Sequence, residues 1–285
     1  MVREKNSFVF SIVNTVLLLC ISLIMLYPFV YLLMISFSPI EELMKSEIFL
    51  YPKVLTLDSY QFVLNHPLIG NAYSVTIYVT VLGTLLNLLI TSLGAYVLAQ
   101  KRLPGKNFFI TLIIVTMVFN GGIIPNYLVV KSLGFIDSLW ALMIPNLINT
   151  FWMIIMRNFF SGIPESLAES ARIDGWSEYR ILFALILPLS GPILATLALF
   201  YGVAHWNEYF NAIIYINKEK LMPLQVLIRS MYDSGAATIP SENLPPPAET
   251  MRAATIMVAT LPILCLYPFL QKYFVQGIMV GAVKG

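Results

Sequence analysis

Long apolar runs dominate the chain and recur at the length that a lipid bilayer requires. Six of them have roughly the 20 residues that a helix needs to cross a hydrocarbon core of about 30 Å. The first run is too long for a signal peptide, and "MLYPFVYLLMISF" continues it without a small-residue cleavage site. The pattern predicts an all-α membrane protein with six transmembrane helices, over about residues 12–37, 72–100, 108–130, 138–157, 192–215 and 253–273.

One charged segment lies between the fourth and fifth of these runs. "AESARIDGWSEYRILFALILPL", residues 168–189, contains two Glu, two Arg and one Asp, yet its apolar residues keep helical spacing. Pro164 suits the first position of a helix, where no amide hydrogen is required. Glu165 and Glu169 follow early, where the positive end of the helix dipole favours carboxylates. A short amphipathic helix is therefore expected here.

A second short helix should follow through a glycine turn. Asp174 is suited to cap its start, and Gly175 supplies a backbone hinge. Pro188 is expected to end this helix. The segment 159–188 is thus predicted to be a helical hairpin. The second helix should carry an aromatic-rich stripe made of Trp176, Tyr179, Phe183 and Ile186.

The hairpin has two interpretations from its residues alone. The small side chains of Ala168, Ser170 and Ala171 would let another protein surface approach closely. The aromatic side chains would equally anchor a connection that lies flat on the membrane surface. Periodicity indicates an amphipathic hairpin and does not identify what it contacts.

Composition supports the membrane class and excludes others. The chain is 58% hydrophobic and 11% charged, and that charged share is about half that of a soluble domain. A net charge of +2 without a long basic run argues against a nucleic-acid partner. Cys20 and Cys265 both lie in apolar segments, so no disulfide framework is expected.

The positions of Lys and Arg predict the orientation in the membrane. With the N-terminus inside, ten basic residues fall on the cytoplasmic side and seven on the outer side. Residues 1–11 and the tail 274–285 would then be cytoplasmic, flanking the six helices of one permease domain, residues 12–285. The hairpin would also face the cytoplasm. Two long connections, 38–71 and 217–251, would lie outside.

Polar residues inside apolar spans are candidates for function because burying them is costly. Asn87, Asn146 and Asn149 fall in the second and fourth spans. They and the other polar positions are interpreted first as partners in hydrogen bonds between helices, and second as parts of an outer gate or substrate path. The candidates for that path are Asn120, His205, Trp206, Asn207, Glu208 and Asn211.

Other chemistry has little support in the sequence. There is no GxxxxGK[ST] motif for phosphate, no HExxH metal motif and no nucleophile in a motif with His205. We therefore expect no catalytic residue, metal or cofactor. A secondary transporter remains an alternative, since "FNGGIIP" offers a break in the third span, although no internal repeat or central acidic residue accompanies it.

The hairpin resembles a known signature. Glu169-Ser170-Ala171, Asp174-Gly175 and Ile186-Leu187-Pro188 are similar to the "EAA…G…I-LP" loop of binding-protein-dependent ABC importer permeases. Ser170 departs from the usual Ala but is also small. The resemblance implies coupling helices that dock into a cleft on an ATP-binding subunit. The residues it places at that contact are Glu165, Ala168, Glu169, Ser170, Ala171, Asp174, Gly175, Trp176, Tyr179 and Pro188.

Further stretches narrow the resemblance to carbohydrate importers. "WNEYFNAIIYI" looks like their "WNEF" region, and "FNGGIIPNYLVVKSLGFIDSLWALMIP" is similar to the subgroup for complex oligosaccharides and polysaccharides. "VQGIMVGAVKG" resembles the tail of the second permease subunit of the maltose-type importer. In that family the tail reaches the interface between the ATP-binding subunits, which implies such a place for Gly281, Lys284 and Gly285.

The resemblance implies the type I importer permease fold and one half of a heterodimeric pore in a bacterial cytoplasmic membrane, surrounded by lipid. A second permease subunit, two ATP-binding subunits and an extracytoplasmic solute-binding protein would complete the assembly. ATP hydrolysis would occur on the separate subunits. In the maltose-type family the sugar is held mainly by the other permease, so no sugar site is expected here. A permease of the same fold for a non-sugar solute is the alternative.

Overall fold

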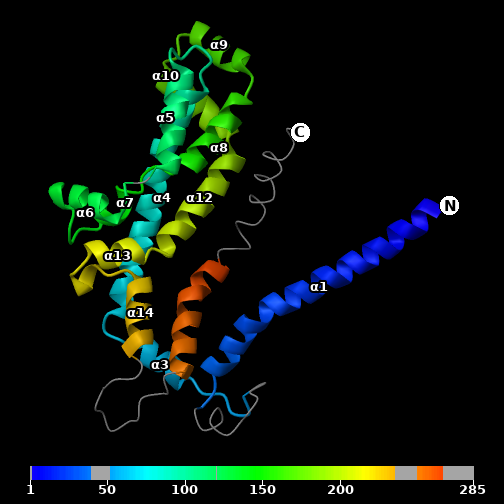
Figure 1. The fold of residues 1–285 in the computed structure, drawn as a ribbon, viewed down its shortest axis with the longest axis vertical. Helices are drawn as coiled ribbons and strands as arrows, with labels where there is room; N and C mark the ends of the chain where they lie inside the picture. Colours follow the sequence, from blue (N-terminus) through cyan, green and yellow to red (C-terminus); the bar gives the residue numbers. More distant parts are fainter. Residues whose placement is uncertain (1, 40–51, 120, 235–248, 266–285) are drawn as a thin grey trace. The chain divides into compact units, whose positions relative to one another are not determined.

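The computed structural model describes residues 2–39, 52–119, 121–234 and 249–265, and these residues form helices and connecting segments without a β-strand. The all-α prediction is therefore confirmed for this part of the chain. The chain divides into two compact units, one of residues 1–69 with 228–261 and one built on residues 70–227 (Figure 1). Each unit is described by itself.

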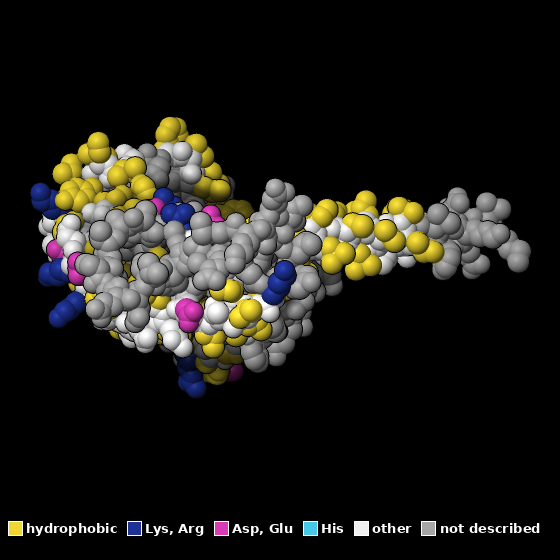
Figure 2. Space-filling model, turned by 90° about the horizontal axis from the view of Figure 1, so that it is seen from below, with side chains coloured by type: hydrophobic (Ala, Val, Ile, Leu, Met, Phe, Trp, Pro, Cys, Tyr) yellow, Lys and Arg dark blue, Asp and Glu magenta, His cyan; other side chains and the backbone are white. Residues whose placement is uncertain are grey.

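The first unit contains the long helix α1 (Val2–Ser36). Its segment Phe10–Ser36 is long and apolar enough to cross a membrane, which agrees with the first predicted span. Hydrophobic side chains cover this segment on the face seen in Figure 2. At its end, the Ser36 hydroxyl is 2.8 Å from that of Tyr60 on α3 (Asp58–Leu64). The unit also contains residues 249–261 of a helix that runs to residue 265, so the predicted span 253–273 extends beyond the described residues.

The second unit packs its helices around α4 (Ile69–Ala99), which matches the second predicted span. Its core is formed by apolar side chains of α4, α8, α12 and the predicted hairpin. α14 (Leu224–Ser234) runs across the boundary between the units. The other helical elements are α5 (Lys106–Val118), α6 (Ile123–Ser132), α7 (Trp140–Met143), α8 (Thr150–Ser161), α9 (Glu165–Ile173), α10 (Glu178–Ile181), α11 (Leu187–Leu189), α12 (Gly191–Trp206), α13 (Phe210–Tyr215) and a 3-10 turn (Glu219–Leu221).

Three predicted spans are interrupted rather than continuous. The third is split into α5 and α6, which are bent by 110°. Gly122 precedes α6 with φ +89°, a backbone conformation that suits glycine. The fourth consists of α7 and α8, separated by a segment that contains Pro145, which lacks an amide hydrogen. The fifth ends at Trp206 and restarts as α13.

The number of spans stays a prediction. In the described residues, two helices are long and apolar enough to cross a membrane, or up to four if each bent pair counts as one span. The sequence offered one break, at "FNGGIIP" in the third span, whereas the structure also has breaks in the fourth and fifth. Non-helical backbone is tolerated at membrane depth only where its polar groups find partners or water.

Polar side chains supply those partners at the break between α7 and α8. The side-chain amide nitrogen of Asn87 donates to the carbonyl oxygens of Asn146 and Leu147, both at 2.8 Å. His205 Nε2 is 2.7 Å from Asn87 Oδ1, which accepts its hydrogen. Tyr201 accepts from the Asn149 amide at 3.2 Å. His205 and Asn87 therefore serve the helix-to-helix hydrogen bonding that the sequence predicted.

Candidate functional site

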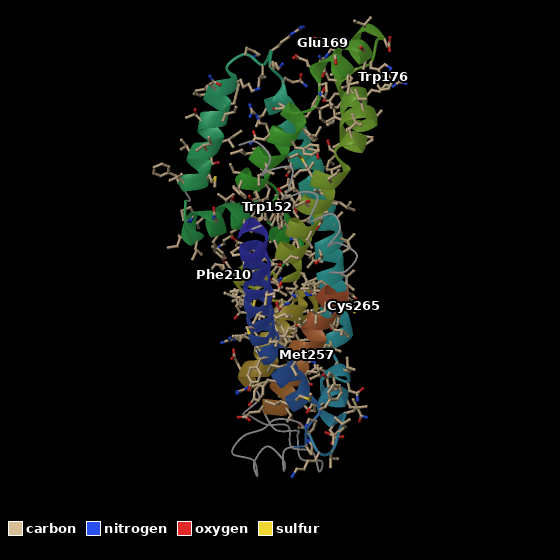
Figure 3. The ribbon with its side chains drawn as sticks, turned by 90° about the vertical axis from the view of Figure 1, so that its right-hand side faces the viewer. Trp152, Glu169, Trp176, Phe210, Met257 and Cys265 are labelled. Atoms are coloured by element: carbon tan, nitrogen blue, oxygen red, sulfur yellow. The ribbon has the colours of Figure 1, made fainter. Side chains whose placement is uncertain are left out.

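The charged segment folds into the predicted pair of short helices. α9 begins directly after Pro164, which occupies the N-cap position. The second arm consists of α10, a π-helical turn (Leu182–Ile186) and α11. A bend of 86° at Ser190 joins it to α12. The hairpin lies at one end of the second unit, with Glu169 and Trp176 near its tip (Figure 3).

Gly175 makes the turn between the two arms, as predicted. Its φ is +82°, and its amide donates to the Arg172 carbonyl at 3.0 Å. The Trp176 amide donates to the Ala171 carbonyl, also at 3.0 Å. This pair of hydrogen bonds is a Schellman motif, which ends a helix at a left-handed residue. The turn therefore has one defined geometry.

The predicted cap of the second arm is wrong. Asp174 is the C-cap of α9 and does not cap α10. Ser177 does so instead, with its hydroxyl oxygen accepting from the Arg180 amide at 3.4 Å. The reason is the Gly175 turn, which places Asp174 within the end of α9 and leaves the first free amides of α10 beyond Ser177.

The four residues of the predicted aromatic-rich stripe do not share one environment. Ile186 is buried and Trp176 packs against the core, while the side chains of Tyr179 and Phe183 are exposed. The π-helical turn from Leu182 to Ile186 holds more residues per turn than an α-helix, so α-helical spacing no longer describes one face there. Pro188 does not end the helix: it lies within α11, which runs to Leu189.

A charged network joins both arms of the hairpin to the end of α4. Arg172 Nε donates to Glu178 Oε1 at 2.7 Å and its terminal nitrogen donates to Gln100 Oε1 at 3.1 Å. The Tyr96 hydroxyl donates to Glu178 Oε2. Arg172, followed by Tyr96, lowers the pKa of the Glu178 carboxyl. This network fixes the angle between α9 and α10.

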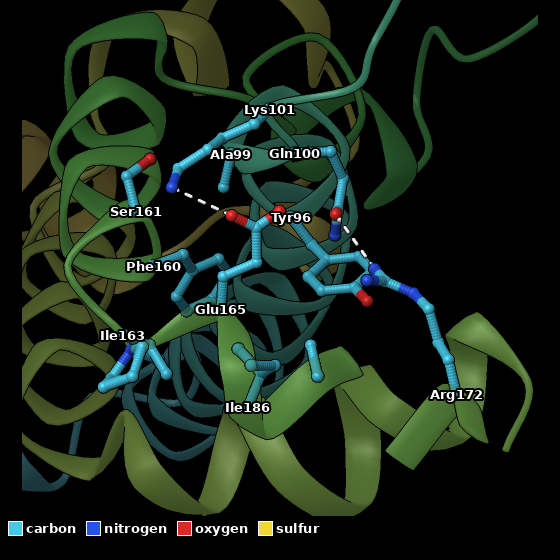
Figure 4. Close-up of a pocket in the computed structure, with 12 residues that line it drawn as sticks. Tyr96, Ala99, Gln100, Lys101, Phe160, Ser161, Ile163, Glu165, Arg172 and Ile186 are labelled. Carbon is cyan, nitrogen blue, oxygen red and sulfur yellow. Dashed lines mark hydrogen bonds and ion pairs between the residues drawn. The ribbon is translucent and has the colours of Figure 1, made fainter. Parts of the chain in front are cut away.

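Two further ion pairs fasten α9 to the segment after α4. Lys101 Nζ is 2.8 Å from Glu165, and Arg102 is 3.2 Å from Glu169. The Lys101–Glu165 pair borders a small pocket of about 60 Å³ between α4, α8 and α9 (Figure 4). Hydrogen bonding to Lys101 lowers the pKa of Glu165. Glu165 and Glu169 thus have partners within the chain.

The small and aromatic residues of the hairpin divide between its own core and its surface. Ala171 is buried, and Ala168 and Trp176 pack against the same core. Arg180 stacks over the Trp176 ring at 4.3 Å from the ring centroid. Ser170 stays exposed. The need for a small residue at Ala171 therefore arises inside the chain.

Two large side chains remain uncovered at the tip. Ile173 is 87% exposed and Tyr179 is 72% exposed. The sequence prediction included Tyr179 but missed Ile173. The sequence feature that could have indicated Ile173 is an isolated Ile at the end of a polar helix, beside Asp174 and Gly175. The hairpin therefore presents exposed apolar and aromatic surface near its turn.

We expect Glu178→Gln to loosen the hairpin, because Arg172 and Tyr96 then lose their shared ionised acceptor. The loss is expected to be about 1 kcal/mol, near the upper end for a partly exposed ion pair. Amide hydrogen exchange over residues 172–181 should become roughly fivefold faster at neutral pH.

Glu169→Gln is the matched control, since its single ion pair with Arg102 is largely exposed.

The dependence of hairpin stability on pH has a definite sign. The lowered pKa of Glu178 stabilises the hairpin above the ordinary Glu value of about 4.3, and this stabilisation is lost as the pH falls through the folded-state pKa. Equal exchange in wild type and Glu178→Gln would contradict the role of the network.

The residues predicted for a gate or substrate path are not gathered into one site. Trp206 is buried, and the Asn207 side chain donates to its own helix at Val203. The Glu208 carboxylate accepts from the backbone and side chain of Asn211, each at 3.1 Å. Asn120, Gly281, Lys284 and Gly285 lie outside the described residues. Among the residues described, no group of three or more His, Cys, Asp or Glu is placed to hold a metal ion.

Comparisons with known proteins agree on one class. The family described as "Binding-protein-dependent transport system inner membrane component" matches residues 105–280. Protein LplC of Bacillus subtilis is 43% identical, over 99% of this chain and 97% of its own. The polygalacturonan/rhamnogalacturonan transport system permease protein YtcP of the same organism is 44% identical, over 94% and 96%.

A solved structure gives the same result for the fold. It is the crystal structure of a bacterial ABC transporter involved in the import of the acidic polysaccharide alginate. The matching chain has a TM-score of 0.85 and 34% sequence identity, and the match covers 93% of this chain and 96% of that one.

Proposed function

The chain belongs to the family of binding-protein-dependent transport system inner membrane components, and we propose that it is one permease subunit of an ATP-driven importer of oligosaccharides. It has the type I ABC importer permease fold and is a membrane protein. Permeases of this kind work with a second permease, ATP-binding subunits and a solute-binding protein. ATP hydrolysis then takes place on the separate subunits.

The observation that carries the proposal is the stiff hairpin of α9 and α10. Its arms are fixed by the Gly175 turn and by the Arg172–Glu178 pair. Its tip presents Ile173 and Tyr179. A docked ATP-binding subunit that moves on ATP binding would push this hairpin, and the packed core of α4, α8 and α12 would carry the displacement into the pore.

The wider assembly follows from the same proposal. The chain would cross a bacterial cytoplasmic membrane six times, with both termini inside, and pair with a second permease as a heterodimer. Two ATP-binding subunits would contact the hairpins, and the tail with Gly281, Lys284 and Gly285 would enter the interface between them. An extracytoplasmic binding protein would deliver the solute.

The substrate class rests on the relatives. One is named for polygalacturonan and rhamnogalacturonan transport, and the solved neighbour imports alginate. A complex oligosaccharide derived from a polysaccharide is therefore proposed here. A non-sugar solute is the alternative, and the ligand of the cognate binding protein separates the two.

Affinity isolation of the chain from its native membrane, followed by mass spectrometry, tests the proposal. An ATP-binding subunit, a second permease and a solute-binding protein should be recovered together. A chain that is recovered alone after crosslinking, yet transports solute when reconstituted, would support the secondary-transporter alternative.

The same isolation gives a sharper result with Gly175→Asp, which should recover about tenfold less ATP-binding subunit. A Cβ atom added at this position meets no described atom within 4 Å, so the variant should fold. Asp and Asn tolerate the left-handed backbone better than other residues. Gly175→Asn is thus a control with nearly the same shape and without the charge. Equal losses in both variants would place the effect in the backbone instead.

A further inference from the structure

A second pocket, of about 240 Å³, lies in the second unit where α6, α13 and the break between α7 and α8 meet. The three helices α6, α7 and α13 lie near one another in Figure 1, and Val130, Ala141 and Tyr215 form a small buried cluster between them. The polar residues of the pocket are Asn126, Asn146 and Asn211, and Phe210 supplies exposed aromatic surface.

The side-chain amides in this pocket keep hydrogen-bonding capacity. The backbone carbonyl of Asn146 is occupied by Asn87, but within the described residues the side-chain amides of Asn126 and Asn146 have no hydrogen-bond partner. Glu208 holds the side-chain nitrogen of Asn211. The carbonyl oxygen of that amide remains as an acceptor. Donors and acceptors from three separate elements thus border one space.

The depth of the pocket makes these open amides informative. Asn87 bonds to the pocket residue Asn146 and lies twelve residues before Ala99, the end of α4. At about 1.5 Å per residue this is about 18 Å of helix, which is close to the middle of a membrane crossed by α4. An amide without a partner is costly in hydrocarbon. Open amides at this depth therefore indicate contact with water or with a polar ligand.

The lining residues indicate which class of ligand the pocket would bind. None of the eight described lining residues is charged, so the pocket offers no cation to a carboxylate. Amides exchange hydrogen bonds with hydroxyl groups in both directions. The Phe210 ring is 53% exposed and offers an apolar face, whereas the Tyr215 ring is buried and stacked with that of Tyr127. A sugar ring combines hydroxyl edges with an apolar face and fits this combination.

We propose that this pocket is a transport-path subsite that binds the hydroxyl edge of one sugar unit through Asn126, Asn146 and Asn211. The inference rests on the importer function proposed above and adds a substrate contact on this chain. In an acidic oligosaccharide the subsite would engage the ring hydroxyls and not the carboxylate.

Thiol labelling of the full complex tests whether the pocket is aqueous. Cys20 and Cys265, both exposed free thiols, are first replaced by Ser. In that background Asn126→Cys should react with a charged, membrane-impermeant thiosulfonate at least tenfold faster than Leu85→Cys. Leu85 is an exposed residue of α4, two positions before Asn87. Equal rates for the two cysteines in a complex with normal ATP hydrolysis would overturn the proposal.

Uptake of a short radiolabelled polygalacturonan fragment into proteoliposomes tests the sugar contact. Asn126→Ala should lower uptake about tenfold, while ATP hydrolysis stimulated by the binding protein stays at the wild-type rate. Ser132→Ala on the same helix is the control, because its hydroxyl bonds only to the Val129 carbonyl. Unchanged uptake by Asn126→Ala, or an equal fall in ATP hydrolysis, would overturn the subsite. If the binding protein does not stimulate ATP hydrolysis by the wild-type complex, that result would instead count against the proposed function.

Discussion

Ile173→Asp is expected to weaken docking of the ATP-binding subunit by more than a hundredfold while leaving the chain folded. Ile173 is 87% exposed at the tip of the hairpin, so its replacement removes no contact within the subunit. Burying an isoleucine at an interface is worth about 1.5–3 kcal/mol. The variant also forces a carboxylate into that interface, and a buried unpaired charge adds a larger penalty.

Binding of the purified ATP-binding subunit to the permease pair in detergent measures this effect directly. Ile173→Met is the matched control, because it keeps an apolar side chain of similar volume and should bind within a factor of about three of wild type. The midpoint of thermal aggregation should be the same in both variants. Wild-type affinity in Ile173→Asp would show that the tip of the hairpin is not buried by the ATP-binding subunit.

The hairpin was the part of the site most readily predicted from sequence, because its signals are local. Charge, helical spacing and a glycine located both arms and the turn at Gly175. Residues that act across the chain were missed. Arg172 and Glu178 are joined to Tyr96 on α4 and to Gln100 directly after it, and no spacing within the loop indicates that partnership. Periodicity also did not predict the π-helical turn from Leu182 to Ile186.

The breaks in the fourth and fifth spans were missed for a related reason, and that in the third was noted only as an option. Hydropathy reports how apolar a segment is and not whether its helix is continuous. Pro145 and Gly122 are local signs of a break, but such residues are also tolerated within membrane helices. The break in the fourth span also depends on a residue of another helix. Asn87 on α4 satisfies the carbonyls of Asn146 and Leu147, so the open backbone between α7 and α8 has a partner that a linear pattern does not reveal.

His205 illustrates how tertiary contacts decide the role of a polar residue. Its ring nitrogen bonds to Asn87 and its ring packs against the backbone of Gly83 on α4. The sequence predicted a structural partner or a gate residue, and the contacts favour the structural one. Gly83 was not singled out, because a glycine inside an apolar helix has many explanations. Here the explanation is close approach between α4 and α12.

Gly83→Ala is therefore expected to be among the most destabilising small substitutions in the chain. A Cβ atom at this position would lie 2.5 Å from His205 Nε2, well inside van der Waals contact. Displacing the ring costs about 1–3 kcal/mol for overpacking, and breaking the bond to Asn87 leaves buried polar groups unpaired at a further cost of about 1–3 kcal/mol. The midpoint of thermal aggregation should fall by about 4 °C or more.

Gly202→Ala on α12 provides the matched control, because its added Cβ would meet Thr84 at 3.7 Å, an ordinary contact. Its thermal midpoint should stay within about 2 °C of wild type. A double-mutant cycle with His205→Ala then identifies the cause. If the clash with the ring is responsible, Gly83→Ala should cost much less stability in the His205→Ala background, since the obstructing atoms are gone. Strictly additive losses would mean that Gly83 is required for another reason, and the close approach of α4 and α12 at His205 would no longer explain it.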